Sequence, residues 1–120
     1  MPKPIESYRD LDVWQLAMDI VVEIYRVTKM FPSDERFGLT SQLRRAAVSI
    51  PSNIAEGHSR LGAGEYRRFV SIARGSVGEV ETQLAVAARL DLSTAELTAS
   101  LDLQLGRLSK MLFSLYRRLA

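Results

Sequence analysis

Apolar residues recur at intervals of three and four positions along almost the whole chain, and no segment shows the strict alternation of a half-buried strand. Spacing of this kind places the apolar side chains on one face of a helix. Breaks in the pattern fall between Pro32 and Gly38 and between Gly57 and Gly64, where residues that disfavour helices gather. The helices that the pattern predicts are 11–31, 39–57, 64–90 and 94–119.

The connections between these segments are short, which favours antiparallel packing of consecutive helices. We therefore predict an all-α fold, an antiparallel up-down-up-down four-helix bundle. Residues 1–120 are enough for a single domain, with 1–9 as an N-terminal extension. The second helix contains Pro51, which has no backbone N–H and crowds the carbonyl of Ala47, so a kink is expected there.

The first predicted helix has a wider apolar surface than one bundle core needs. Two apolar stripes lie about a quarter of a turn apart at 3.6 residues per turn. One stripe consists of Leu11, Trp14, Met18, Val21, Tyr25 and Thr28. The other consists of Val13, Ala17, Ile20, Ile24, Val27 and Phe31. One core cannot use both stripes, which favours a homo-oligomer over a monomer.

The third predicted helix has a strip of small residues opposite its apolar face: Ser71, Gly75, Gly78 and Thr82. A glycine inside a helix costs roughly 1 kcal/mol relative to alanine, and close approach of another helix would offset that cost. The alternative is an ordinary exposed face. We predict that this strip and Trp14 contribute to the oligomer interface. The alternatives for Trp14 are a place in the core or a role as a binding platform.

Composition places the chain among ordinary globular proteins, with 47% apolar and 25% charged residues. The absence of cysteine excludes disulfides and thiolate metal sites and is compatible with a reducing cytoplasm. The first residues lack the apolar core of a signal peptide, and no run of about 18 apolar residues could cross a membrane. We expect a cytoplasmic protein without a membrane partner.

Charge is unevenly distributed along the chain, although the net charge is only +2. Segments 1–35 and 75–106 are acidic, whereas 36–74 and 107–120 are basic. The predicted topology would gather arginines at one end of the bundle and acidic residues at the other, which makes the molecule bipolar. Arg67 and Arg68 are the most informative, because the helix dipole favours acids, not bases, in a first turn.

Clustered arginines favour an anionic partner, because phosphate binding is largely electrostatic. The default alternative is a solvated charged surface. The candidate residues for binding RNA or DNA are Arg44, Arg45, Arg60, Arg67, Arg68, Arg74, Arg117 and Arg118.

Residues suited to catalysis are sparse. His58 is the only histidine, and with Glu56 it is too small a set of ligands for a metal site, so a solvated position near a helix end is expected. Asn53 lies on the core side of the second helix, where it could satisfy backbone groups freed around Pro51 or contact another subunit. No phosphate-binding loop or serine nucleophile motif is present. We predict no enzyme, no catalytic residue, no cofactor and no metal.

Several segments carry a family resemblance. The most distinctive is FGLTSQLRRAAVSIPSNIAEG, from Phe37 to Gly57. Others are Leu11–Gln15, Glu65–Phe69, Ile72–Ser76 and Lys110–Leu112. Together, and in this order, they resemble the bacterial four-helix-bundle proteins called the 23S rRNA intervening-sequence family. The resemblance covers essentially the whole chain, with a small departure at the linker that precedes the third helix.

The resemblance implies a four-helix bundle and a ring-shaped homo-oligomer, a pentamer. Genes of this family occur within insertions in large-subunit ribosomal RNA genes and elsewhere in genomes, and the molecular function of the family is unassigned. A similar fold serves as the basic accessory protein of diversity-generating retroelements, which is thought to bind nucleic acid and a reverse transcriptase; this is an analogy of fold. The leading hypothesis is a non-enzymatic homo-oligomer that binds RNA or other nucleic acid. The alternative is a structural or protein-binding scaffold.

Overall fold

Four long helices dominate the computed structural model, which describes residues 4–120. They are α1 (Asp12–Thr28), α2 (Leu39–Ser59), α3 (Ala63–Arg89) and α4 (Ala95–Arg118). Short 3-10 helices, η1 (Tyr8–Asp10) and η2 (Ser33–Glu35), precede α1 and α2. No strand occurs within the described residues. The prediction of an all-α protein with four helices is confirmed.

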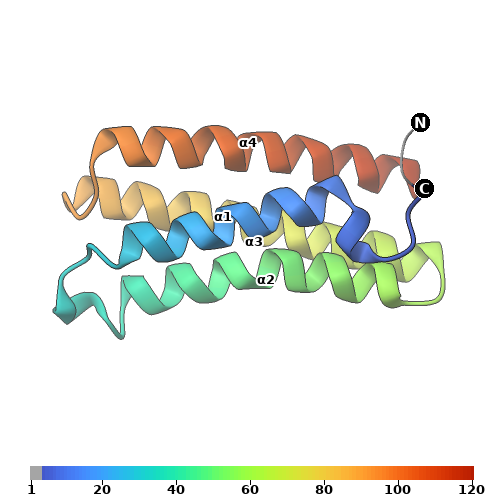
Figure 1. The fold of residues 1–120 in the computed structure, drawn as a ribbon, viewed down its shortest axis with the longest axis horizontal. Helices are drawn as coiled ribbons and strands as arrows, with labels where there is room; N and C mark the ends of the chain where they lie inside the picture. Colours follow the sequence, from blue (N-terminus) through green and yellow to red (C-terminus); the bar gives the residue numbers. More distant parts are fainter. Residues whose placement is uncertain (1–3) are drawn as a thin grey trace.

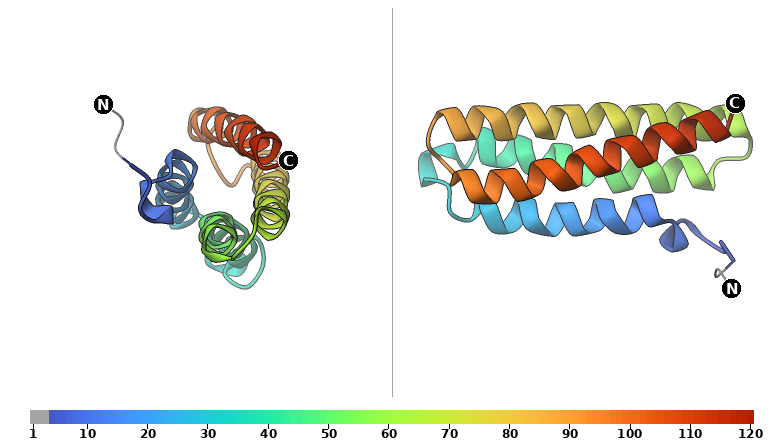
Figure 2. Two further views of the ribbon diagram at one scale, coloured as in Figure 1. Left: turned by 90° about the vertical axis from the view of Figure 1, so that its right-hand side faces the viewer. Right: turned by 90° about the horizontal axis from the view of Figure 1, so that it is seen from above.

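The helices lie side by side along an elongated body of 43 × 29 × 20 Å. Figure 1 shows α1 and α3 running in one direction and α2 and α4 in the other. Seen from the end in Figure 2, the helices surround a common centre in chain order, so that each packs against two neighbours. This arrangement brings the start of α1, the end of α2, the start of α3 and the end of α4 to one end of the bundle.

The core contains only one of the two apolar stripes predicted for α1. Val13, Ala17, Ile20, Ile24, Val27 and Phe31 are buried, together with the apolar faces of the other helices. The second stripe lies partly on the surface: Met18 is 37% and Tyr25 is 39% exposed, while Trp14 is half-buried. None of the described helices is both long and apolar enough to cross a lipid bilayer.

Helices α2 and α3 approach each other closely at Gly57. A Cβ atom at this position would lie 2.7 Å from Cβ of Phe69 and 3.2 Å from the carbonyl oxygen of Tyr66. By contrast, apart from the neighbouring backbone of α3 itself, no atom of residues 4–120 lies within 4 Å of the Cβ positions of Gly75 and Gly78. Within the chain, no helix packs on these two glycines.

Helix α2 continues through Pro51, and polar side chains bond to the carbonyls around it. Asn53 Nδ2 donates to the carbonyl of Ser49 at 2.7 Å, and Ser52 Oγ donates to that of Val48 at 2.8 Å. The carbonyl that Pro51 leaves without its helical donor is that of Ala47, and neither bond reaches it, so the role of Asn53 at the proline stays a prediction. The kink of the helix axis at Pro51 stays a prediction.

Candidate nucleic-acid interface

Most of the predicted arginines gather at the end of the bundle where α2 ends, α3 begins and α4 ends. They are Arg60, Arg67, Arg68, Arg74, Arg117 and Arg118. Arg44 and Arg45 lie in the first half of α2, toward the opposite end. There Arg44 Nε donates to Thr28 Oγ1 at 2.9 Å and its guanidinium lies 4.5 Å from the ring centroid of Tyr25, so it joins α2 to α1. Neither Arg44 nor Arg45 therefore lies among the arginines at the first end.

Two arginines of α3 reach across to α4. Arg67 Nε donates to the carbonyl of Tyr116 at 3.2 Å, and its guanidinium carbon lies 3.8 Å from the centroid of the Tyr116 ring. Arg74 Nε donates to the carbonyl of Ser109 at 3.3 Å, and its guanidinium carbon lies 5.1 Å from the centroid of Phe113. Arg117 approaches the same phenyl ring, at 5.9 Å. These contacts hold the arginines flat along the boundary between α3 and α4.

The hydrogen bond from Arg67 to α4 explains why an arginine occupies this position, which the sequence alone does not reveal. Although Arg67 lies in the first turns of α3, the carbonyl of Tyr116 belongs to the last turn of α4. The carbonyls of a last helical turn lack their regular helical donors and attract cations, and that of Tyr116 accepts only a shorter-range bond from the N–H of Leu119, at 3.2 Å, besides the one from Arg67. Arg67 therefore stabilises the end of α4, and its position in α3 alone does not indicate a ligand.

Arg60 and Arg68 are exposed and each forms an ion pair on its own helix. Arg60 contacts Glu56 at 2.7 Å, and Arg68 contacts Glu65 at 3.4 Å. The hydrogen bond and the charge of Glu56 raise the pKa of Arg60 above its ordinary value. Both guanidinium groups lie over the ring of Phe69, at 5.2 and 4.6 Å from its centroid. Exposed ion pairs contribute at most about 1 kcal/mol, so a phosphate can compete for these cations.

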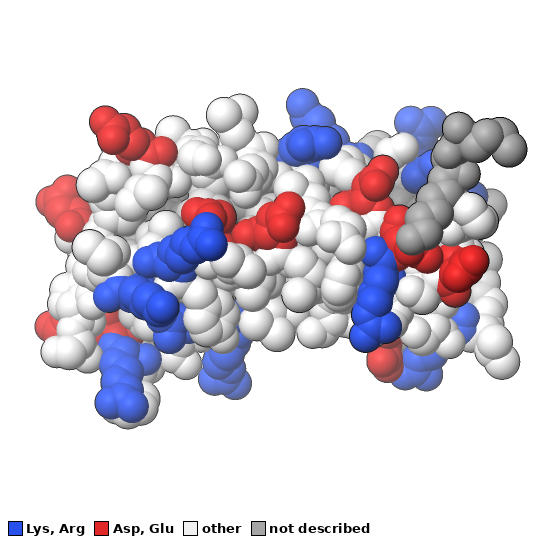
Figure 3. All heavy atoms as spheres, in the orientation of Figure 1, with Lys and Arg blue, Asp and Glu red and all other residues white. Residues whose placement is uncertain are grey.

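Both ends of the bundle carry charges of both signs, so the predicted bipolar charge distribution stays a prediction. Acidic residues accompany the arginines at the end described above: Glu6, Asp10, Asp12, Glu56 and Glu65. The opposite end carries Lys29, Arg36 and Arg89 beside its acids. On the face seen in Figure 3, basic and acidic side chains are mixed along the whole length.

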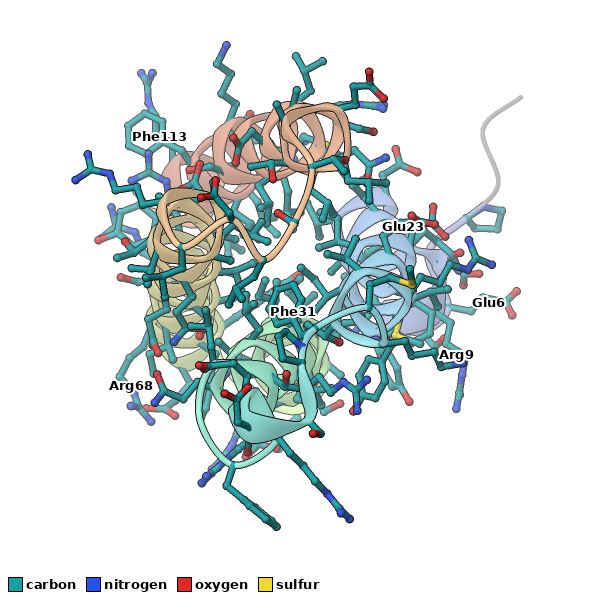
Figure 4. All side chains as sticks on the ribbon, turned by 90° about the vertical axis from the view of Figure 1, so that its left-hand side faces the viewer. Glu6, Arg9, Glu23, Phe31, Arg68 and Phe113 are labelled. Carbon is teal, nitrogen blue, oxygen red and sulfur yellow. The ribbon has the colours of Figure 1, made fainter. Side chains whose placement is uncertain are left out.

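A basic excess also lies on the side formed by α3 and α4. From residue 107 onward α4 carries Arg107, Lys110, Arg117 and Arg118 and no acidic residue. Figure 4 shows Arg68 and Phe113 projecting from this side, whereas Glu6 and Glu23 project from the side of α1 and Phe31 points to the centre. The candidate interface is therefore a side of the bundle near one end, not the end itself.

Two shallow hollows occupy this basic side. One, of about 470 Å³, is lined by Gly64, Arg67, Arg68, Ser71, Ile72 and Tyr116. The other, of about 380 Å³, is lined by Phe113, Ser114, Arg117 and Arg118. Each hollow combines an aromatic ring with two arginines, and Phe113 and Tyr116 are neighbours three residues apart on α4. We define these hollows as the α3–α4 basic hollows.

The residues predicted for an oligomer interface divide between two sides of the bundle. Ser71, Gly75, Gly78 and Thr82 lie on the outward face of α3 and are exposed or half-exposed. On α4, Gly106 likewise has no atom within 4 Å of its Cβ position. Trp14 lies elsewhere, in an apolar groove of about 300 Å³ between α1 and α2, with its ring 5.4 Å from that of Tyr8.

His58 and Glu56 have ordinary structural partners. The imidazole of His58 lies edge-on to the ring of Tyr66 at 5.5 Å, and Glu56 holds Arg60. Burial raises the pKa of Tyr66, and the nearby charge of Arg118 opposes that shift. Over residues 4–120, no three histidine, aspartate or glutamate side chains converge in a way that could hold a metal ion.

Sequence reasoning did not identify the aromatic residues of the basic side, Phe69, Phe113 and Tyr116. A local signal was available for one of them, because Phe113 and Arg117 are four residues apart and lie on the same face of a helix. Nothing local pairs Tyr116 with Arg67, since the two residues belong to different helices.

Comparisons with known proteins agree with the fold. A family model described as 23S rRNA-intervening sequence protein matches residues 9–114. A crystal structure from Bacteroides thetaiotaomicron, described as a protein of unknown function from the S23 ribosomal protein family, superposes with a TM-score of 0.81. It shares 23% sequence identity, over 87% of this chain and 97% of its own. A search of curated proteins found no match.

Proposed function

The chain belongs to the 23S rRNA-intervening sequence protein family, and from that premise we propose that it is a non-enzymatic homo-oligomer that binds nucleic acid, in particular RNA. The observation that carries this proposal is the gathering of arginines from two helices, α3 and α4, at the α3–α4 basic hollows. Phosphate contacts from arginine supply most of the affinity of sequence-independent binding. We further propose that the protein acts in the cytoplasm.

The electrostatics of the hollows support an anionic ligand. Arg68, Arg74, Arg117 and Arg118 are exposed, and the last three turns of α4 contribute no acid to offset them. Arg67 is already engaged with α4, so we assign it to positioning of the surface and place the binding energy on its exposed neighbours. Arg44 and Arg45 are left out of the proposed surface because they lie toward the other end of α2.

Two exposed surfaces of the bundle support the proposed self-association. The open glycines of α3 accommodate close approach of another helix, and the apolar groove beside Trp14 offers partly exposed side chains on another side of the bundle. Contact between two different surfaces is heterologous, and such contacts close into rings when the rotation permits. The family resemblance makes a pentamer the expected ring. Ser71 belongs to both the glycine strip and a basic hollow, so the hollow would border the subunit boundary.

A scaffold that binds other proteins or serves a structural purpose is the second candidate. It is favoured by the same apolar groove and by the internal partners of Arg60 and Arg68, which give these arginines a use without nucleic acid. The two proposals differ in their dependence on salt, because only phosphate binding releases condensed counterions.

Charge reversal on the basic side tests the proposal. Arg68→Glu with Arg117→Glu should abolish binding of a fluorescent RNA at low salt, because two exposed cations beside the hollows become anions. Wild-type affinity should fall steeply between about 50 and 200 mM salt. The control is Arg36→Glu with Arg89→Glu, which reverses two exposed arginines at the other end and should leave binding within about twofold.

Two outcomes would contradict this prediction. If the wild type binds no RNA or DNA at low salt, the scaffold becomes the leading function. If both double variants weaken binding equally, the effect belongs to net charge and not to the basic side. Circular dichroism of all three proteins should be the same, because every substituted side chain is exposed.

A further inference from the structure

The aromatic rings of the basic side form stacking surfaces that phosphate binding alone does not require. Phe113 is 44% exposed, although a phenyl side chain of this size is normally buried. Arg74 and Arg117 lie near its ring, and Arg67 lies over that of Tyr116. Each hollow thus presents a ring and guanidinium groups together.

We propose that the α3–α4 basic hollows bind single-stranded nucleic acid in preference to duplex, by stacking unpaired bases on Phe113 and Tyr116. The inference rests on the proposed nucleic-acid function and names the form of the ligand. Bases stack readily on aromatic rings and on guanidinium planes, and their phosphates are contacted by arginine. Phe113 and Tyr116 follow each other on one edge of α4, which provides two consecutive positions along a strand.

The arginines that span α3 and α4 prepare these surfaces for binding. Arg67 and Arg74 are held by hydrogen bonds to backbone carbonyls of α4, so their planes are fixed before a ligand arrives. Side chains that are already ordered lose less conformational freedom on binding, which raises affinity.

A duplex cannot use these surfaces, because its bases are stacked on one another and expose only their edges in the grooves. The long helices that the structure describes all pack within the bundle, and none projects as a separate element that could enter a major groove. A duplex therefore gains only the phosphate contacts, whereas a single strand gains phosphate contacts and stacking.

The test compares a single-stranded oligonucleotide with a duplex of the same sequence, by fluorescence anisotropy at one salt concentration. The variant is Phe113→Leu, which keeps an apolar side chain and every charge but removes the ring. The matched control is Phe37→Leu, because Phe37 is 88% exposed beneath Arg36 at the opposite end of the bundle. We expect Phe113→Leu to weaken single-strand binding about tenfold, as loss of one stacked base predicts. Duplex affinity and the salt dependence should not change, and Phe37→Leu should behave as the wild type.

The outcomes separate this inference from the function on which it rests. If the wild type binds single strand and duplex equally, or if Phe113→Leu has no more effect than Phe37→Leu, the stacking inference is wrong while nucleic-acid binding stands. If the wild type binds neither, the proposed function fails and the stacking inference fails with it. Equal weakening of single-strand and duplex binding by Phe113→Leu also overturns the inference, because loss of stacking affects only unpaired bases.

Discussion

Single residues of this chain show how the surroundings of a side chain decide its use. Arg67 and Arg68 are adjacent in sequence and identical in type, yet one donates to the backbone of a neighbouring helix and the other pairs with an acid one turn away. The difference arises because successive residues of a helix point about 100° apart. Only Arg68 keeps a largely exposed guanidinium that can meet a ligand.

The glycines provide the sharpest test at this scale. Gly57→Ala should lower the free energy of unfolding by about 1–3 kcal/mol, because the new Cβ would lie 2.7 Å from Cβ of Phe69, where helix packing leaves no room. Gly106→Ala, where the Cβ meets open space, should raise stability by up to about 1 kcal/mol through helix propensity. Thermal or denaturant unfolding measures both changes. Equal effects of the two substitutions would contradict the packing described for α2 and α3.

At the scale of the helices, the period of the apolar residues was enough to predict the elements. It predicted four helices and two apolar stripes on α1, but it did not decide which of the stripes forms the core. The small strip of α3 was also placed correctly on the face away from the core. These features are local, since they depend on which residues share a face of a single helix.

The candidate site was less predictable because its contacts join helices that are distant in sequence. Arg67 and Tyr116 are 49 residues apart, and Arg74 and Ser109 are 35 apart. Periodicity shows which face of its helix a residue occupies, but not which residue of the neighbouring helix lies beside it. The pairing of the arginines of α3 with the aromatic rings of α4 could therefore not be derived. The predicted charge separation considered the arginines at one end without the acids that the same helix ends carry, so it stays a prediction.

The strip on α3 leads to a prediction about assembly. Gly75→Leu should not weaken folding, because no described atom of another helix lies within 4 Å of the new Cβ. It should disrupt a homo-oligomer, because a leucine side chain would separate two closely packed helices. Sedimentation velocity at micromolar concentration should show the wild type as an oligomer and the variant as a smaller species. Gln42→Leu, at an exposed position of α2 and therefore away from the strip, is the control. A monomeric wild type would refute the assembly itself.

At the scale of the whole molecule, assembly and nucleic-acid binding should reinforce each other. A ring repeats the basic side once per subunit, so a strand long enough to reach two subunits gains a second contact at high effective concentration. The gain can reach roughly 10²–10⁴-fold in affinity without any new contact within one subunit. A strand that reaches only one subunit has no such advantage.

The corresponding experiment measures how affinity depends on strand length in the oligomer and in the Gly75→Leu variant. Wild-type affinity should rise steeply once the oligonucleotide reaches a second subunit, because the second binding event is then intramolecular. The variant should bind a short strand about as well as the wild type, since its arginines and rings are unchanged, but should show little gain with length. Phe113→Leu provides the converse control: it should weaken short and long strands alike while keeping the length dependence. If the Gly75→Leu variant sediments as a smaller species and its affinity still rises steeply with strand length, the gain in affinity arises within one subunit. The proposed cooperation between the ring and the basic side would then be wrong.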